Sequence, residues 1–132
     1  KKVKTVILFG YHGKLIKLAG GIFHTHNHLA DGRIEILVYL AVKENIPIEI
    51  IVKLSHLNNL EDALLLLEKF NKSISNKLFQ TLSNTIERRS IEYVNRYVRT
   101  NMEIAAIIFD RQRKIRWWGI KGNDYISYFK CD

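Results

Sequence analysis

The sequence has 132 residues, of which 47% are hydrophobic and 26% charged, and its formal net charge is +8. This length and composition predict one globular domain over residues 1–132, long enough to bury about two-thirds of its unfolded surface. No apolar run approaches the roughly 20 residues that span a bilayer, and no signal-peptide pattern follows the basic start. The single cysteine, Cys131, excludes an intramolecular disulfide and fits a reducing cytoplasm.

The positive charge favours an anionic partner through long-range attraction. Nucleic acid is one candidate, and a small polycarboxylate or phosphorylated ligand is another. A lysine-rich surface that only keeps the protein soluble explains the composition equally well.

The predicted elements begin with a buried strand and a short helix. Residues Val3 to Phe9 are apolar and β-branched, and the strand that they predict ends at Gly10. A helix is expected over Gly13 to Ala19, and the pair Gly20-Gly21 suits its carboxyl end.

The middle of the chain is predicted to be mainly helical. Asp31 is a suitable N-cap for a helix that runs through Glu44, whereas Ile46 to Leu54 fits a helix or a strand. Asn59 and Glu61 resemble an N-cap and its capping acid before a helix through residue 70. Two further helices are predicted, over Ser75 to Arg88 and Ser90 to Arg99.

The end of the chain has the pattern of a hairpin. Strands are expected over Glu103 to Phe109 and Lys114 to Gly119, with the polar run Asp110 to Arg113 between them. Trp117 and Trp118 lie on opposite faces of the second strand, so one ring is expected in the core. The tail from Asn123 to Tyr128 fits a short helix or an edge segment. The fold class is therefore α/β or α+β, with a small mixed sheet that ends in a hairpin and is covered by several helices.

The turn from Gly10 to Lys14 has the chemistry of an anion site. A glycine turn between a strand and a helix directs backbone N–H groups and the positive end of the helix dipole to one place. Lys14 and Lys17 lie one turn apart and would add positive charge. The P-loop pattern is excluded, because Leu8 and Leu15 stand where it needs glycine and Ser or Thr. A tight turn with solvated lysines remains the alternative.

Three further patterns carry weaker signals. The alternate histidines His24, His26 and His28 could ligate zinc, but no cysteine is near and loop histidines more often move protons or form hydrogen bonds. Arg33 opposes the dipole at a helix start, which hints at a carboxylate ligand. A cluster of arginines and tyrosines suggests an RNA-binding face, although interspersed acids favour a solvated surface: Arg88, Arg89, Tyr93, Arg96, Tyr97 and Arg99.

One run of the sequence resembles the signature of a known family. Its parts are Gly13 to Ala19, Gly21, Ile22-Phe23, Thr25-His26 and Ala30 to Arg33, followed by Glu35. In this order and spacing they resemble the cobalt-precorrin-5B (C1)-methyltransferase family of the anaerobic cobalamin pathway. The sequence departs from the family pattern at His24 and His28. Since the pattern keeps only His26, we expect no metal site.

The resemblance implies an enzyme that transfers a methyl group from S-adenosylmethionine to C1 of a ring-contracted cobalt corrinoid. Members of the family are much longer and carry a glycine- and threonine-rich signature in their N-terminal half, which is absent here. The chain thus resembles the C-terminal part, and a missing N-terminal half or a second subunit would complete the enzyme. No S-adenosylmethionine loop of the usual kind is present, so the sequence does not place the donor.

The substrate implied by the resemblance is a flat macrocycle that carries acetate and propionate groups. Helix N-termini and basic side chains suit such a polycarboxylate. The predicted substrate-binding residues are Gly10, Gly13, Lys14, Lys17, Thr25, Asp31, Gly32 and Arg33. His12 and His26 are the candidates for moving a proton on the macrocycle. A basic module that binds RNA or another polyanion without catalysis is the alternative function, and we expect neither a membrane nor nucleic acid as the partner.

Overall fold

A three-stranded mixed sheet organises the molecule in the computed structural model, which describes residues 3–21, 32–99 and 101–129. Strand β1 (Thr5–Tyr11) pairs in parallel with β2 (Glu103–Phe109), and β2 pairs antiparallel with β3 (Ile115–Trp118). The sheet order is β1-β2-β3, so β1 lies at an edge. The mixed sheet and the hairpin confirm the predicted α/β class.

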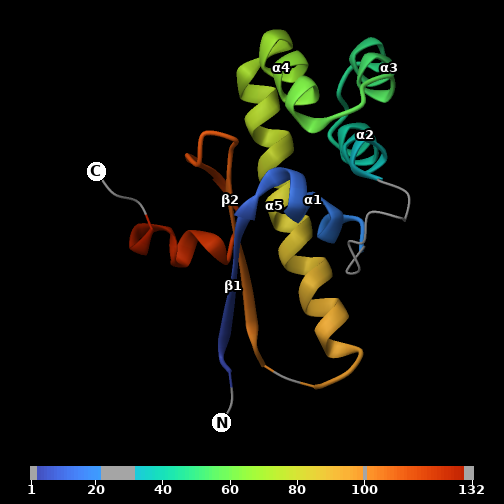
Figure 1. Ribbon diagram of the computed structural model, residues 1–132. Helices are drawn as coiled ribbons and strands as arrows, with labels where there is room; N and C mark the ends of the chain where they lie inside the picture. Colours follow the sequence, from blue (N-terminus) through green and yellow to red (C-terminus); the bar gives the residue numbers. More distant parts are fainter. Residues whose placement is uncertain (1–2, 22–31, 100, 130–132) are drawn as a thin grey trace.

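The helices gather mainly at one face and one end of the sheet. Figure 1 shows α2, α3 and α4 beyond the carboxyl end of β1, while α5 runs down the length of the sheet. Two 3₁₀ turns follow β3 and lie on the other side, where Tyr125 contacts Thr5 and the Phe129 ring packs against Phe9. The described helices are α1 (His12–Ala19), α2 (Arg33–Lys43), α3 (Ile48–Ser55), α4 (Leu60–Phe70) and α5 (Lys72–Asn95). No described helix is long and apolar enough to cross a membrane.

The two helices predicted after residue 75 form the single helix α5, so this expectation was wrong. The run Glu87 to Ser90, where the two predicted helices meet, contains no glycine or proline that would interrupt a helix. Glu87 and Ser90 lie three residues apart on one face and are buried, at 6% and 3% exposure. The predicted extension to Arg99 is also wrong, because the helix ends at Asn95, and Val98 beyond it is 60% exposed.

Smaller differences concern the ends of elements. Strand β1 continues through Gly10 to Tyr11, and α1 follows at once. The ambiguous segment after residue 46 is helical, because Pro47 supplies the extended N-cap backbone from which α3 begins. Gly32, with a φ of 76°, occupies the N-cap position of α2 that was predicted for Asp31, which lies outside the described residues.

The core lies between the sheet and the helices. Ile16, Leu37 and Leu67 are fully buried and join α1, α2 and α4 to it. The Trp117 ring stacks on Phe79 of α5, with ring centroids 4.4 Å apart, which confirms that one tryptophan belongs to the core. Neighbouring Trp118 is more exposed, and its indole N–H donates to Asn123.

The buried carboxylate of Glu87 joins α5 to the sheet and to the first 3₁₀ turn. It accepts backbone N–H groups from Ala106 at 2.8 Å, Lys121 at 2.9 Å and Gly122 at 2.7 Å. Gly119 makes room for it, because a Cβ there would lie 2.1 Å from the carboxyl carbon. Charge-assisted hydrogen bonds of this kind are strong, so Glu87 fixes the segment after β3 against the helix.

Candidate functional site at the carboxyl end of the strands

Three side chains meet where β1 ends. The Tyr11 hydroxyl donates a hydrogen bond to Oε2 of Glu61 at 2.6 Å, and Nε2 of His12 lies 2.9 Å from the same oxygen. The His12 side chain has no exposed surface, whereas that of Glu61 is 24% exposed. The His12–Glu61 contact falls short of hydrogen-bond alignment, and Nδ1 of His12 has no hydrogen-bond partner among the described atoms. Glu61 is therefore the solvent-accessible end of a cluster that continues into the core.

Local structure places each member of this cluster. Tyr11 ends β1 and His12 begins α1, so the two rings lie close together with centroids 4.3 Å apart. Gly13 allows this arrangement, because a Cβ there would lie 2.4 Å from the Tyr11 ring. Glu61 lies in the first turn of α4, which Asn59 caps by accepting the N–H of Asp62, as the predicted N-cap required.

The surroundings shift the pKa values of the Tyr11 and His12 side chains in opposite directions. Burial first, and then the hydrogen bond and negative charge of Glu61, raise the pKa of Tyr11 to about 12. Burial lowers the pKa of His12 below its ordinary value of 6.5, although the Glu61 carboxylate partly opposes this shift. At neutral pH the cluster therefore holds a protonated phenol and a neutral imidazole.

A second polar group lies at the carboxyl end of β2. Arg116 of β3 pairs with Glu68 of α4 at 2.5 Å and with Asp110 at 3.5 Å, and its guanidinium lies 4.6 Å from the centre of the Trp117 ring. Asp110 also accepts the backbone N–H groups of Gln112 and Lys114, which shapes the hairpin. A cleft of about 730 Å³ adjoins this group.

The predicted site residues are brought together only in part. Gly10, His12 and Gly13 surround the end of β1, and Arg33 is the first residue of α2. The positive charge of Arg33 acts on the Tyr11 hydroxyl, where it lowers the pKa slightly against the larger upward shift. Thr25, His26 and Asp31 lie outside the described residues.

The two predicted lysines differ in exposure. Lys14 is exposed, whereas Lys17 on the next turn of α1 is only 8% exposed. Tyr11 was not predicted as a site residue, and Glu61 was predicted only as a helix-capping acid. A short-range pattern does not reveal their pairing, because the two residues are 50 positions apart. In the part of the chain that the structure describes, no three His, Cys, Asp or Glu side chains are placed to hold a metal ion.

Fold and site together define an α/β protein with its polar cluster at the carboxyl ends of two parallel strands, where α/β proteins commonly bind ligands. Comparison with known proteins identifies the family more closely. Residues 24–119 match the family described as "CbiD, C-terminal domain". The chain belongs to this family.

Curated relatives agree with that assignment. A protein of Prochlorococcus marinus strain MIT 9215, named cobalt-precorrin-5B C(1)-methyltransferase, is 80% identical over 98% of this chain and 35% of its own length. The protein of the same name from strain MIT 9303 is 46% identical over 95% of this chain and 32% of its own length. The chain thus spans about a third of the curated relatives that it matches. No solved structure is a significant match.

Proposed function

We propose that this chain is the substrate-binding C-terminal part of a cobalt-precorrin-5B C1-methyltransferase, which forms cobalt-precorrin-6A in anaerobic cobalamin biosynthesis. The observation that supports this most strongly is the 80% identity over 98% of the chain to a relative of that name. The enzyme would work in the cytoplasm with S-adenosylmethionine as methyl donor. The remaining part of the enzyme, or a second subunit, would complete the site.

The positive side chains near the end of β1 suit a macrocycle with acetate and propionate groups. Lys14 is exposed on α1, and Arg33 begins α2 close enough to affect the Tyr11 hydroxyl. Arginine binds a carboxylate through two parallel hydrogen bonds, and lysine adds a mobile positive charge. We therefore place the substrate over the carboxyl end of β1, with its carboxylates toward Lys14 and Arg33. The burial of Lys17 makes it a weaker candidate than either.

Methyl transfer needs a route for one proton. When a methyl group leaves a sulfonium and bonds to a ring carbon, the sulfur becomes a neutral thioether and the macrocycle loses a proton. His12 has no exposed surface with which to reach the substrate. Glu61 is partly exposed, and its Oε2 lies 2.9 Å from Nε2 of His12. We propose that Glu61 accepts the proton and that His12 acts through Glu61 as a positioning residue. Much of the rate enhancement would come from holding the reacting carbons in line.

The described residues do not themselves fit the methyl donor. They contain no glycine-rich loop of the usual S-adenosylmethionine kind, and the nearby carboxylates already have partners. Glu61 contacts Tyr11 and His12, while Glu68 and Asp110 pair with Arg116. We propose that the other part of the enzyme supplies most of the donor site.

A labelled methyl-transfer assay tests this function. The full-length enzyme that carries this sequence is incubated with cobalt-precorrin-5B and S-adenosylmethionine that is ¹³C-labelled in its methyl group, beside the relative from strain MIT 9215 as control. We expect both to add one labelled methyl group at a saturated ring carbon. If the relative methylates the corrinoid and this enzyme does not, the proposal is wrong. Salt-dependent RNA binding without corrinoid binding would support the polyanion alternative.

A further inference from the structure

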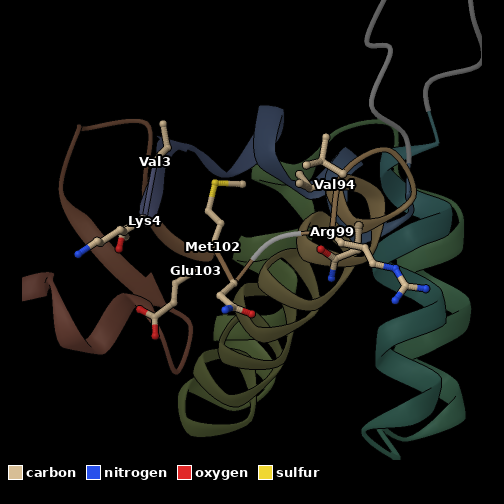
Figure 2. A pocket seen from close by; sticks show the side chains of 10 residues that line it. Val3, Lys4, Val94, Arg99, Met102 and Glu103 are labelled. Carbon is tan, nitrogen blue, oxygen red and sulfur yellow. The ribbon is translucent and has the colours of Figure 1, made fainter. Parts of the chain in front are cut away.

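We propose that a groove at the opposite end of the sheet is the docking surface for the N-terminal part of the same enzyme. The inference rests on the proposed function, because it takes the chain as one part of a longer polypeptide. The groove has a volume of about 1250 Å³ and lies between the starts of β1 and β2 and the end of α5. Figure 2 shows the side chains that line it.

The groove combines apolar contact surface with free positive charge. Val3 and Val98 line it and are 62% and 60% exposed, and Val94 and Met102 add further apolar surface. Such exposed aliphatic side chains, grouped around one hollow, are typical of a surface that another protein segment covers. Lys4, Arg99 and Glu103 also line the groove (Figure 2), and the Glu103 carboxylate pairs with Lys121, which leaves the two cations without an acidic partner among the described residues. An occupant with apolar side chains flanked by carboxylates would match both features.

The free edge of the sheet continues this surface. Strand β1 pairs with β2 on one side, and no described strand pairs with its other side. An open strand edge presents unpaired N–H and C=O groups, which proteins normally cover or pair. Because Lys4 and Thr5 of the same segment line the groove, one partner could cover both the groove and the start of this edge.

Chain length identifies that partner. The matched family is a C-terminal domain, and the chain spans 35% of the relative from strain MIT 9215, so about two-thirds of such an enzyme precedes this part. Val3 and Lys4, which lead into β1, line the groove themselves. A covalently linked partner has a high effective concentration at a nearby surface. The N-terminal part therefore reaches this groove more readily than a second copy or a separate molecule.

The test uses the full-length enzyme and does not depend on its activity. In the wild-type enzyme we expect slow hydrogen exchange over residues 94–99 and 101–103, and cross-links from Lys4 to lysines of the N-terminal part. Val98→Asp, which places a charge in the apolar contact, should make exchange over residues 101–103 about tenfold faster and remove the cross-links. Leu65→Asp is the matched control, because Leu65 is 65% exposed on α4, far from the groove. This variant should keep both signals of the wild-type enzyme.

Results of three kinds of measurement would overturn the docking proposal: hydrogen exchange, cross-linking and RNA binding. The first is fast exchange over the groove in the wild-type enzyme, or an equal effect of the two aspartate variants. The second is cross-linking of Lys4 only between two copies, shown with isotopically mixed protein. The third is RNA binding that Val98→Asp abolishes. A protected groove in an enzyme that fails to methylate the corrinoid would refute the proposed function and leave the docking proposal intact. An active enzyme with an exposed groove would refute the docking proposal and leave the proposed function intact.

Discussion

At the scale of residues, the pairing of a buried histidine with a partly exposed glutamate is the feature most closely tied to chemistry. His12 has no solvent contact, so any proton that it exchanges must pass through a neighbour, and Glu61 is 2.9 Å away. The Tyr11 hydroxyl donates to the same carboxylate oxygen and holds it in place. The three residues thus form one unit, in which a change at Glu61 affects both rings.

Replacing Glu61 should change the titration of Tyr11. Burial is the largest cause of its raised pKa of about 12, and Glu61 supplies the next two, a hydrogen bond and negative charge. In Glu61→Gln the charge is lost, so we expect the pKa of Tyr11 to fall while staying above its ordinary value of 10.0. The phenolate absorbance of each protein, minus that of the same protein with Tyr11→Phe, measures this change. An unchanged pKa would show that Glu61 has no electrostatic influence on Tyr11.

His12 should make the folded state sensitive to mild acid. Because burial lowers its pKa, the unfolded chain binds a proton more readily than the folded protein below pH 6.5. The stability that His12 contributes is complete above this pH and is lost as the pH falls through the lowered pKa of the folded state. Urea unfolding at a series of pH values should show a shallower acid loss in His12→Gln than in wild type. Equally steep acid losses in His12→Gln and wild type would show that His12 is not the group responsible.

Sequence patterns predicted the roles of residues whose interaction partners are close to them in the sequence. The N-cap role of Asn59 was predicted because its partner, the N–H of Asp62, is three positions away. The burial of one tryptophan was predicted because successive side chains of a strand point to opposite faces of the sheet. The link between Tyr11 and Glu61 depends instead on how α4 packs beyond β1, and no local pattern records that packing.

At the scale of elements, the main failure of prediction has the same origin. Helix α5 was predicted as two helices that meet within the polar run Glu87 to Ser90, where charged residues are normally exposed. Glu87 is buried in this run because three backbone N–H groups of β2 and the C-terminal segment, 19 to 35 positions away, converge on its carboxylate. Strand β1, the hairpin of β2 and β3, and helix α4 were predicted well, because each has its own periodicity and end signals in the sequence.

The packing of Glu87 against Gly119 gives a sharp test of this part of the fold. In Gly119→Ala, the added Cβ would lie 2.1 Å from the Glu87 carboxyl carbon and displace it from its three N–H donors. We expect a loss of about 3 kcal/mol in the free energy of unfolding, measured in urea. The control is Gly10→Ala, whose Cβ would lie 3.1 Å from Cγ of the Leu15 side chain, a much longer approach that should cost less. Equal losses in the two variants would argue against the role assigned to Glu87.

The N-cap of α4 connects helix stability to the site. Asn59→Ala removes the acceptor for the Asp62 N–H and should destabilise the protein by about 1 kcal/mol. Because Glu61 lies in the same first turn, fraying there should also lower the pKa of Tyr11 toward its ordinary value. Asn71 caps α5 in the same way, so Asn71→Ala should cost similar stability without changing the Tyr11 titration. A shift of the Tyr11 pKa in both variants would mean that general loosening causes it.

At the scale of the whole molecule, the two ends of the sheet carry different features. The carboxyl end holds the Tyr11–His12–Glu61 cluster beside Arg33, and the amino end holds the groove between β1, β2 and α5 (Figure 1). This separation would let one end face the substrate while the other joins the rest of the enzyme. The site at the carboxyl end was predicted from its glycines and lysines. The groove at the amino end was not predicted, because its residues come from three separate segments.

The cations at the carboxyl end, exposed Lys14 and partly buried Arg33, should contribute directly to substrate binding. Lys14→Ala and Arg33→Ala in the full-length enzyme should each weaken binding of a cobalt corrinoid about tenfold, since each removes one charge-assisted contact with a carboxylate. Lys43→Ala serves as the control, because Lys43 is exposed at the end of α2 and lies over the Tyr39 ring. Absorbance titration gives the dissociation constants, and urea unfolding checks that stability is preserved. If Lys14→Ala and Arg33→Ala bind as tightly as Lys43→Ala, the substrate does not lie over this end of β1.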